Sequence, residues 1–150
     1  MKKLSTALLA SAVVSLAVVA FAPAAARDTY KVSSVLTSKA DVPAPKGAPN
    51  ARGTFTGSYR ENATGGVLTW KLTFSRLTGR ALAAHIHLGK LRVAGAVLVP
   101  LCGPCHSGQT GTVKLTKATI AAIEGGRTYV NVHTAKNAGG EIRGQIKATG

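Results

Sequence analysis

Two histidines in the middle of the chain are spaced so that they could bind one metal ion. They are His85 and His87, in the short sequence Ala-His-Ile-His. Side chains alternate between the two faces of a β-strand, so both imidazoles would project from one face, about 7 Å apart along the backbone. Two such rings can converge on a metal ion. The alternative is a pair of exposed or hydrogen-bonded histidines that binds nothing.

A third histidine, His133, occurs in the segment 129–134, which also alternates like a strand. Val130 and Val132 share one face, and His133 lies on the other. If this strand packs near the first, three neutral imidazole nitrogens meet, a ligand set that suits copper or zinc. No carboxylate-rich cluster accompanies them, which disfavours a Ca²⁺ or Mg²⁺ site. The alternative is that Asn131 and His133 only bond the backbone of the following turn.

A pair of cysteines, Cys102 and Cys105, is followed directly by His106. This Cys-x-x-Cys-His pattern is used to attach c-type haem. Met1 is the one methionine of the sequence, and its removal with an N-terminal signal peptide would leave no methionine as a distal haem ligand. A thioredoxin-type redox pair needs a helix that begins at the first cysteine, whereas residues 107–113 read as loop and strand. The third interpretation, which we favour, is a local disulfide that stiffens a loop, with a modest gain in stability because the ring is short.

The charge balance is strongly basic: 19 Lys and Arg face 5 Asp and Glu, for a net charge of +14. The basic residues are scattered and are not interleaved with aromatic residues, so a nucleic-acid-binding surface is not predicted. A basic exported protein would be attracted to anionic polymers or lipids of the cell envelope. The alternative is a solvated surface that only keeps the protein soluble.

No catalytic constellation is evident beside the histidines. The sequence lacks the Gly-x-Ser-x-Gly elbow of a serine hydrolase. A hydrolase with paired carboxylates is hard to build, because no two acidic residues are close in sequence or on matched strands. The acidic residues are Asp28, Asp41, Glu61, Glu124 and Glu141.

Residues 1–26 have the features of a secretory signal peptide: Lys2 and Lys3, an apolar run, and a small-residue cleavage site near Ala26. Removing this segment leaves 17 basic and 5 acidic residues, a net charge of +12. We therefore expect a secreted, periplasmic or envelope protein in which a disulfide can form. No apolar run after residue 26 is long enough to cross a membrane.

The rest of the chain predicts one all-β domain. Residues 27–52 form an N-terminal strand and a proline-rich segment, and residues 53–150 form the core of the domain. Short strands separated by polar turns are typical of an antiparallel Greek-key β-sandwich. Thr116 caps the one short helix, residues 116–124. Strands are expected at residues 31–37, 53–60, 67–75, 80–88, 93–101, 112–115, 127–134 and 141–148. The predicted core consists of Trp70, Leu72, Phe74, Ile86, Val130, Val132 and Ile142.

Several short motifs, in order along about 110 residues, resemble the CHRD (chordin) domain of exported bacterial proteins. They are residues 41–43 (DVP), 53–55 (GTF), 84–89 (AHIHLG), 111–116 (GTVKLT), 129–134 (YVNVHT) and 139–146 (GGEIRGQI). The resemblance implies an immunoglobulin-like sandwich similar to that of copper–zinc superoxide dismutase. It implies no settled activity for the family.

The similarity to the dismutase sandwich assigns roles to individual residues. His85, His87 and His133 resemble three copper ligands, and Arg143 resembles the arginine that guides the anionic substrate. The long zinc loop is missing, and only His106 lies between the histidine pair and His133. The resemblance therefore implies a copper-only site and no zinc site.

Two functional hypotheses follow. The first, which we favour from sequence alone, is an exported module without catalytic activity that binds another protein or an anionic envelope component. The second is a copper-binding protein that uses His85, His87 and His133, with or without redox activity; an open copper site that cycles between two oxidation states could react with superoxide. Convergence of the three imidazole nitrogens distinguishes the two.

Overall fold

The computed structural model describes residues 29–150 and shows nine antiparallel strands and one short α-helix. The predicted signal segment, residues 1–26, lies outside the described residues, so export remains a prediction. The strands are β1 (Thr29–Thr37), β2 (Arg52–Asn62), β3 (Gly65–Ser75), β4 (Ala81–Leu88), β5 (Val97–Cys102), β6 (Gln109–Thr116), β7 (Thr128–Thr134), β8 (Ile142–Gln145) and β9 (Lys147–Thr149); a 3₁₀ turn (Ser38–Ala40) follows β1, and the helix α1 (Lys117–Glu124) precedes β7.

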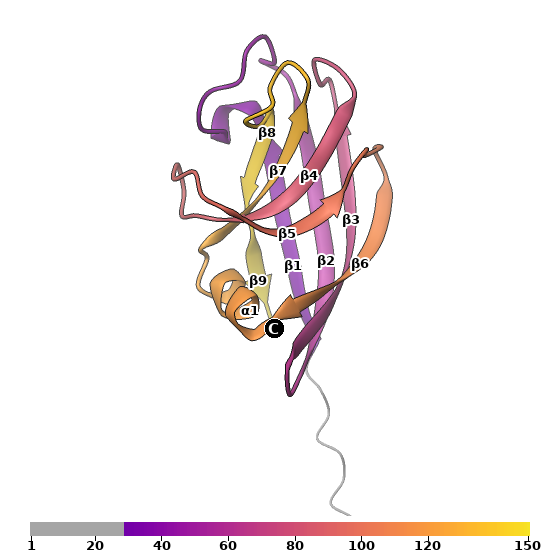
Figure 1. Ribbon diagram of the computed structural model, residues 1–150, viewed down its shortest axis with the longest axis vertical. Helices are drawn as coiled ribbons and strands as arrows, with labels where there is room; N and C mark the ends of the chain where they lie inside the picture. The colour runs from indigo at the N-terminus through magenta and orange to yellow at the C-terminus, as the bar shows by residue number, and fades with distance from the viewer. Residues whose placement is uncertain (1–28) are drawn as a thin grey trace, which may run out of the picture.

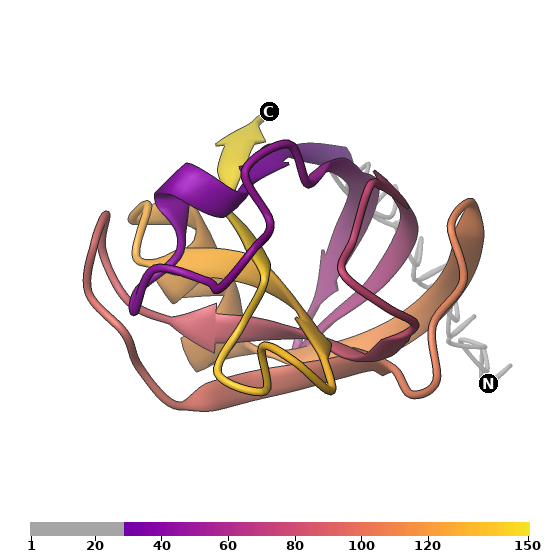
Figure 2. The same cartoon turned by 90° about the horizontal axis from the view of Figure 1, so that it is seen from above.

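The strands form one continuous sheet in the order β5-β4-β7-β8-β1-β2-β3-β6, and β9 pairs with β1. The sheet curls around a single core, so that the edge strands β5 and β6 come into contact and the barrel is nearly closed (Figures 1 and 2). The predicted all-β antiparallel class is therefore confirmed. Eight of the strands follow one hydrogen-bonded path from β5 to β6. The more specific prediction, a Greek-key sandwich of two sheets, stays a prediction.

The inward faces of the strands supply the core. Six of the seven predicted core residues are buried, and Phe74 is half-buried at its edge. Trp70 packs across Gly111 of the neighbouring strand, where an added methyl group would lie 2.6 Å from the indole ring. The six buried members are Trp70, Leu72, Ile86, Val130, Val132 and Ile142.

The alternation predicted for the strand at 80–88 is only partly correct. In the sequence Leu82, Ala84, Ile86 and Leu88 alternate with Ala81, Ala83, His85 and His87, which predicts that the first four share one face. Ala84 and Ile86 are buried, but Leu82 and Leu88 are 51% and 39% exposed. Ala81, expected on the opposite face, is buried in the core. The pairing of β4 with β7 shifts register between Ala81 and Ala83, and such an irregularity reverses which of Ala81 and Leu82 faces inward. Leu88 is the last residue of β4.

The helix α1 begins where the sequence predicts. The Thr116 hydroxyl accepts a hydrogen bond from the Thr119 amide at 3.1 Å, and Ile120 and Ile123 are buried against the barrel. Within residues 29–150, no helix has the length and apolar character needed to cross a membrane. The predicted last strand, 141–148, is divided into β8 and β9 at the buried residue Ile146.

Candidate metal centre

Strands β4 and β7 bring the three histidines together across 48 residues of sequence. The two strands pair antiparallel, with His85 opposite Asn131, His87 opposite Tyr129 and Ala83 opposite His133. The three imidazoles project from the side of the sheet that faces away from Ile86 and Val130. The convergence expected from the alternation of polar and apolar residues is therefore present.

The ring nitrogens are close enough to share one ion. His85 Nδ1 lies 3.2 Å from His133 Nε2, and one nitrogen from each of the three rings lies within 4.8 Å of the others. The ring centroids are separated by 5.0 Å between His85 and His133 and by 5.6 Å for the other two pairs. Imidazole nitrogens that ligate copper or zinc lie about 2.0–2.1 Å from the metal, so small ring rotations would complete the site.

Backbone carbonyls fix the orientation of two of the rings. His87 Nδ1 donates to Gly95 O at 3.0 Å, and His133 Nδ1 donates to Ala138 O at 3.0 Å. A neutral imidazole carries one N–H, so the Nε2 atoms of both rings keep a free lone pair. His87 Nε2 is buried and has no hydrogen-bond partner. An N–H held by a carbonyl, with the opposite nitrogen unpaired, is the arrangement found around metal-binding histidines.

The third ring completes this pattern in a different way. Because His133 Nε2 can only accept, His85 Nδ1 donates the hydrogen bond between the two rings. A metal ion bound to His85 Nδ1 would replace that proton, and the neutral ring would then carry its one proton on Nε2. Metal binding therefore requires a change of tautomer at His85 alone.

Burial favours the neutral form of two of the imidazoles, those of His85 and His133. Burial lowers the pKa of His85, and the neighbouring His87 lowers it further. Burial also lowers the pKa of His133, to about 4. The hydrogen bond to Ala138 raises this pKa, and the charges of His85 and His87 lower it further. Neutral rings at neutral pH are the form that binds a metal ion.

Arg143, the predicted anion guide, is buried behind the histidines. Its side chain is 1% exposed, and its guanidinium carbon lies 3.4 Å from the centre of the Tyr129 ring. One guanidinium nitrogen, Nη2, donates to Lys90 O and Val93 O at 2.9 and 3.0 Å. Burial lowers the pKa of Arg143, although the charges of Tyr129 and Asp41 raise it. The side chain clamps the β4–β5 connection, and anion guidance stays a prediction.

A buried polar layer supports the same face of the sheet. Asn131 Nδ2 donates to Asp41 Oδ1 at 3.2 Å, whereas Asp41 Oδ2, Asn131 Oδ1 and Arg143 Nη1 are buried without partners. Burial raises the pKa of Asp41, although hydrogen bonds from Val42 and Asn131 oppose the change. Glycine at position 140, with φ of 136°, leaves room for this layer.

Glu141 organises the turn that carries the carbonyl partner of His133. It is fully buried and accepts hydrogen bonds from Thr134 Oγ1 at 2.6 Å, from Asn137 Nδ2 at 2.9 Å and from Thr78. Burial alone would raise the pKa of Glu141, but these hydrogen bonds outweigh it and lower the pKa below its usual value. A charged, fully bonded Glu141 therefore fixes the turn at Ala138.

Cys102 and Cys105 form a disulfide, which confirms the local-disulfide interpretation. The sulfur atoms of both cysteines are therefore in the disulfide, and neither residue is a free thiol. The bond closes the loop between β5 and β6, and Cys105 N donates to Ala81 O at 3.0 Å. His106 follows in the same loop and is exposed. It is not among the three residues of the histidine cluster.

The order of the motifs along the chain corresponds to a known family. The family model of the CHRD domain matches residues 32–146. The chain belongs to the CHRD domain family. No curated protein and no solved structure shows a significant match to the chain.

Some elements of this CHRD domain site were not predicted from the sequence. Gly95 and Ala138 act through their backbone carbonyls, and a carbonyl has no signature in a sequence. Tyr129 stacks on His87 with ring centroids 5.0 Å apart. Its position opposite His87 on a neighbouring strand was the only available signal, and it required knowing which strands pair.

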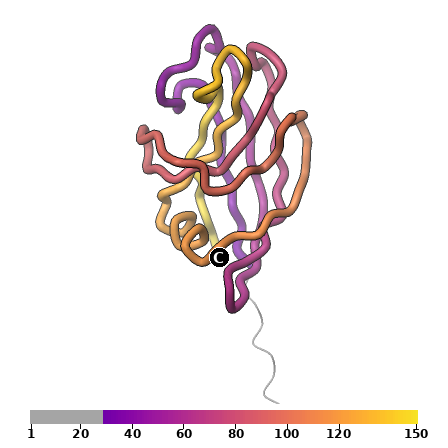
Figure 3. The backbone as a smooth tube through the Cα atoms, viewed as in Figure 1, coloured from indigo at the N-terminus to yellow at the C-terminus, as the bar shows by residue number. Residues whose placement is uncertain are grey.

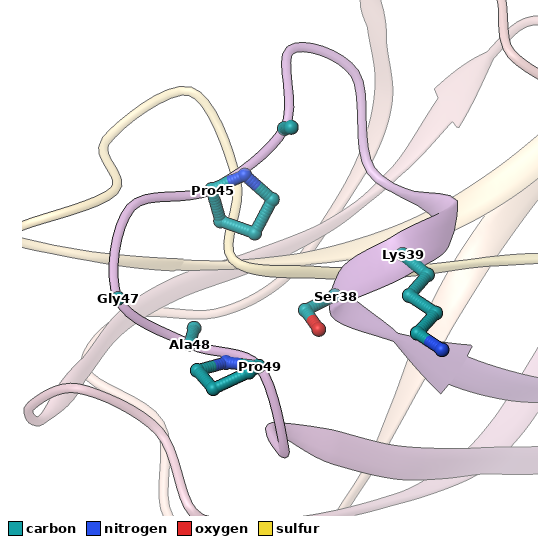
Figure 4. Close-up of a pocket in the computed structure, with 7 residues that line it drawn as sticks. Ser38, Lys39, Pro45, Gly47, Ala48 and Pro49 are labelled. Carbon is teal, nitrogen blue, oxygen red and sulfur yellow. The ribbon is translucent and has the colours of Figure 1, made fainter.

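A separate hollow of the CHRD domain lies in the proline-rich loop after β1 (Figure 4). Pro45 and Pro49 line it together with Ser38 and Ala48, and Lys39 supplies the one charged side chain. None of its lining residues belongs to the histidine cluster. This hollow therefore offers no chemistry to the metal centre.

Proposed function

We propose that this CHRD domain binds a single transition-metal ion, copper, through His85, His87 and His133. The observation that carries the proposal is His87 Nε2, a buried nitrogen without a partner that lies beside the other two imidazoles. An unpaired buried polar atom costs about 1–3 kcal/mol. A metal ion at this position would remove that cost.

The ligand set supports copper among the divalent ions. Within residues 29–150 no carboxylate or thiolate joins the three imidazoles in the cluster. Imidazole sites bind Cu²⁺ more tightly than the other first-row divalent metals. Bound copper would supply a redox-active centre. The protein would supply three oriented nitrogen ligands, with Gly95 O and Ala138 O holding two of the rings.

Reaction with superoxide is not part of this proposal. The resemblance to the dismutase sandwich assigned anion guidance to Arg143, and that guanidinium is buried and bonded to backbone carbonyls. The geometry supports metal binding in its own right. The location of the protein outside the cytoplasm stays part of the proposal, on the basis of residues 1–26.

Calorimetric titration of metal-free protein with Cu²⁺, in a buffer that contains a weak competing chelator, tests the proposal. We expect one equivalent to bind. Loss of a hydrogen-bond partner behind a metal ligand weakens metal affinity about 10–100-fold. His87→Gln removes a ligand itself, so it should weaken copper binding by more than this. His106→Gln is the matched control, because His106 is exposed and outside the cluster, and it should bind like the wild type.

Circular dichroism of each variant establishes that the fold is retained. Equal copper uptake by the wild type and by the His87→Gln and His133→Gln variants would refute the proposal. A parallel titration with Zn²⁺ should show weaker binding, as the general order of metal affinities requires.

A further inference from the structure

The connection between β4 and β5, residues 89–96, projects from the side of the barrel (Figures 1 and 3). We call it the β4–β5 loop. At its tip Leu91 is 67% exposed and Val93 is 54% exposed, and Val97, where β5 begins, is 49% exposed. Lys90 and Arg92 alternate with these apolar residues and are also exposed. The loop therefore presents an apolar tip surrounded by positive charge.

Side chains from β7 and β8 hold the backbone of this loop in place. Arg143 bonds the carbonyls of Lys90 and Val93, and Gln145 Nε2 donates to Gly89 O at 2.7 Å. The Gly95 amide donates to the Tyr129 hydroxyl at 3.1 Å. The backbone is thus anchored at both ends while the apolar side chains at the tip face solvent. A surface that is already ordered loses little conformational entropy when it binds.

The surrounding surface is almost uniformly basic. Within residues 29–150, fifteen of the sixteen Lys and Arg residues are exposed, and Arg143 is the exception. Of the four acidic residues in this range, Asp41 and Glu141 are buried, which leaves Glu61 and Glu124. A complementary partner must therefore be anionic.

The apolar surface continues beyond the loop. Leu91 and Lys147 line a groove of about 440 Å³ with Val35, which is 73% exposed on the outer face of β1. Exposed apolar residues that cluster beside basic ones mark a contact surface. A projecting loop is suited to a soft anionic layer, because apolar tip residues can enter it while the flanking bases remain at its surface.

We propose that the β4–β5 loop is a membrane-docking device, which inserts Leu91 and Val93 into the headgroup region of a bilayer containing anionic lipid. Lys90 and Arg92 contact the lipid phosphates. This inference is independent of copper binding, because no histidine takes part in it. It places the metal centre next to the membrane surface, since Gly95 of the same loop bonds His87.

Sedimentation with vesicles tests the proposal on the purified protein. Vesicles of phosphatidylglycerol and phosphatidylcholine should bind the protein, and vesicles of phosphatidylcholine alone should not. The double variant Leu91→Ser and Val93→Ser should bind at least about tenfold more weakly, because burial of two apolar side chains is lost. Val67→Ser, at an exposed apolar residue of β3, is the matched control and should bind like the wild type.

The charge contribution has its own pair of variants. Arg92→Gln should weaken binding about fivefold, the effect of one basic residue at an anionic surface. Lys114→Gln, an exposed base on β6, should have a smaller effect. A Leu91→Trp variant should shift its fluorescence to shorter wavelength on the anionic vesicles, whereas Val67→Trp should not.

Three results would overturn the proposal. The first is failure of the wild type to bind anionic vesicles. The second is equal binding of the wild type and the Leu91→Ser and Val93→Ser double variant to anionic vesicles, which would mean diffuse electrostatic adsorption. The third is binding to an acidic polypeptide such as polyglutamate without binding to vesicles, which would indicate a protein partner.

Discussion

The guanidinium carbon of Arg143 lies 3.4 Å from the centre of the Tyr129 ring. Tyr129 on β7 lies between His87 on the neighbouring strand β4 and Arg143 on the neighbouring strand β8. The Tyr129 hydroxyl accepts from the Gly95 amide, and Gly95 O accepts from His87. A buried cation is therefore linked to an imidazole of the histidine cluster through one aromatic ring and one loop residue.

Replacement of Arg143 by methionine should weaken both the fold and the metal site. The Arg143→Met variant keeps an apolar contact with Tyr129 but loses both hydrogen bonds of Nη2. Val93 O is then left without its side-chain donor, whereas Lys90 O still accepts from the Val93 amide at 3.0 Å. We expect a loss of about 2–4 kcal/mol in the free energy of unfolding, measured with urea. Copper affinity should fall about tenfold through the loosened loop. Arg80→Met, at an exposed base, should change neither, and an Arg143→Met protein as stable as the wild type would contradict the clamp role.

Glu141→Gln should destabilise the turn that supports His133. The amide retains the size of the carboxylate but replaces one acceptor oxygen by a donor, facing Thr78, Thr134 and Asn137. The expected cost is about 1–3 kcal/mol at neutral pH. Because the pKa of Glu141 is lower in the folded protein, its contribution is present above its ordinary value of 4.5 and is lost as the pH falls below it. The stability of the variant, followed by denaturation at several pH values, should lack this acid-dependent loss. A variant with the wild-type pH profile would show that Glu141 is not the group responsible.

The metal-free protein should lose stability on mild acidification. His133 has a pKa of about 4 when folded and about 6.5 when unfolded. Between these values the unfolded chain binds more protons than the folded one, so the free energy of unfolding decreases as the pH falls from about 6.5 to about 4. Thermal unfolding across this range measures the effect. His133→Asn should show a shallower decrease, and an unchanged slope in that variant would exclude His133 as its source.

Gly140→Ala should be strongly destabilising although it adds only one methyl group. Glycine at this position has φ of 136°, and an added Cβ would lie 2.3 Å from Asn131 Nδ2 and 2.4 Å from Asp41 Oδ2. We expect a cost of about 1–3 kcal/mol from strain and displacement of the polar layer. Gly79→Ala is the control, because no atom lies within 4 Å of its added methyl group. Equal stability of the two variants in urea denaturation would contradict this packing.

Local sequence patterns predicted most of the strands, the helix cap at Thr116 and the shared face of His85 and His87. The strand predicted at 93–101 begins only at Val97, because residues 93–96 belong to the β4–β5 loop. They could not predict that β4 pairs with β7, because residues 48 positions apart leave no local signal. The same limit applies to Leu82, whose exposure follows from a register shift between Ala81 and Ala83 that periodicity cannot detect. Arg143 was predicted at an anionic substrate site, and its burial depends on the course of the β4–β5 loop, which the strand pattern does not determine.

The most direct test of the metal centre is the anomalous difference map of a crystal soaked with one equivalent of copper. The account predicts one peak, about 2.1 Å from His85 Nδ1, His87 Nε2 and His133 Nε2. No peak at these three nitrogens, or copper bound only at the exposed His106, would contradict it.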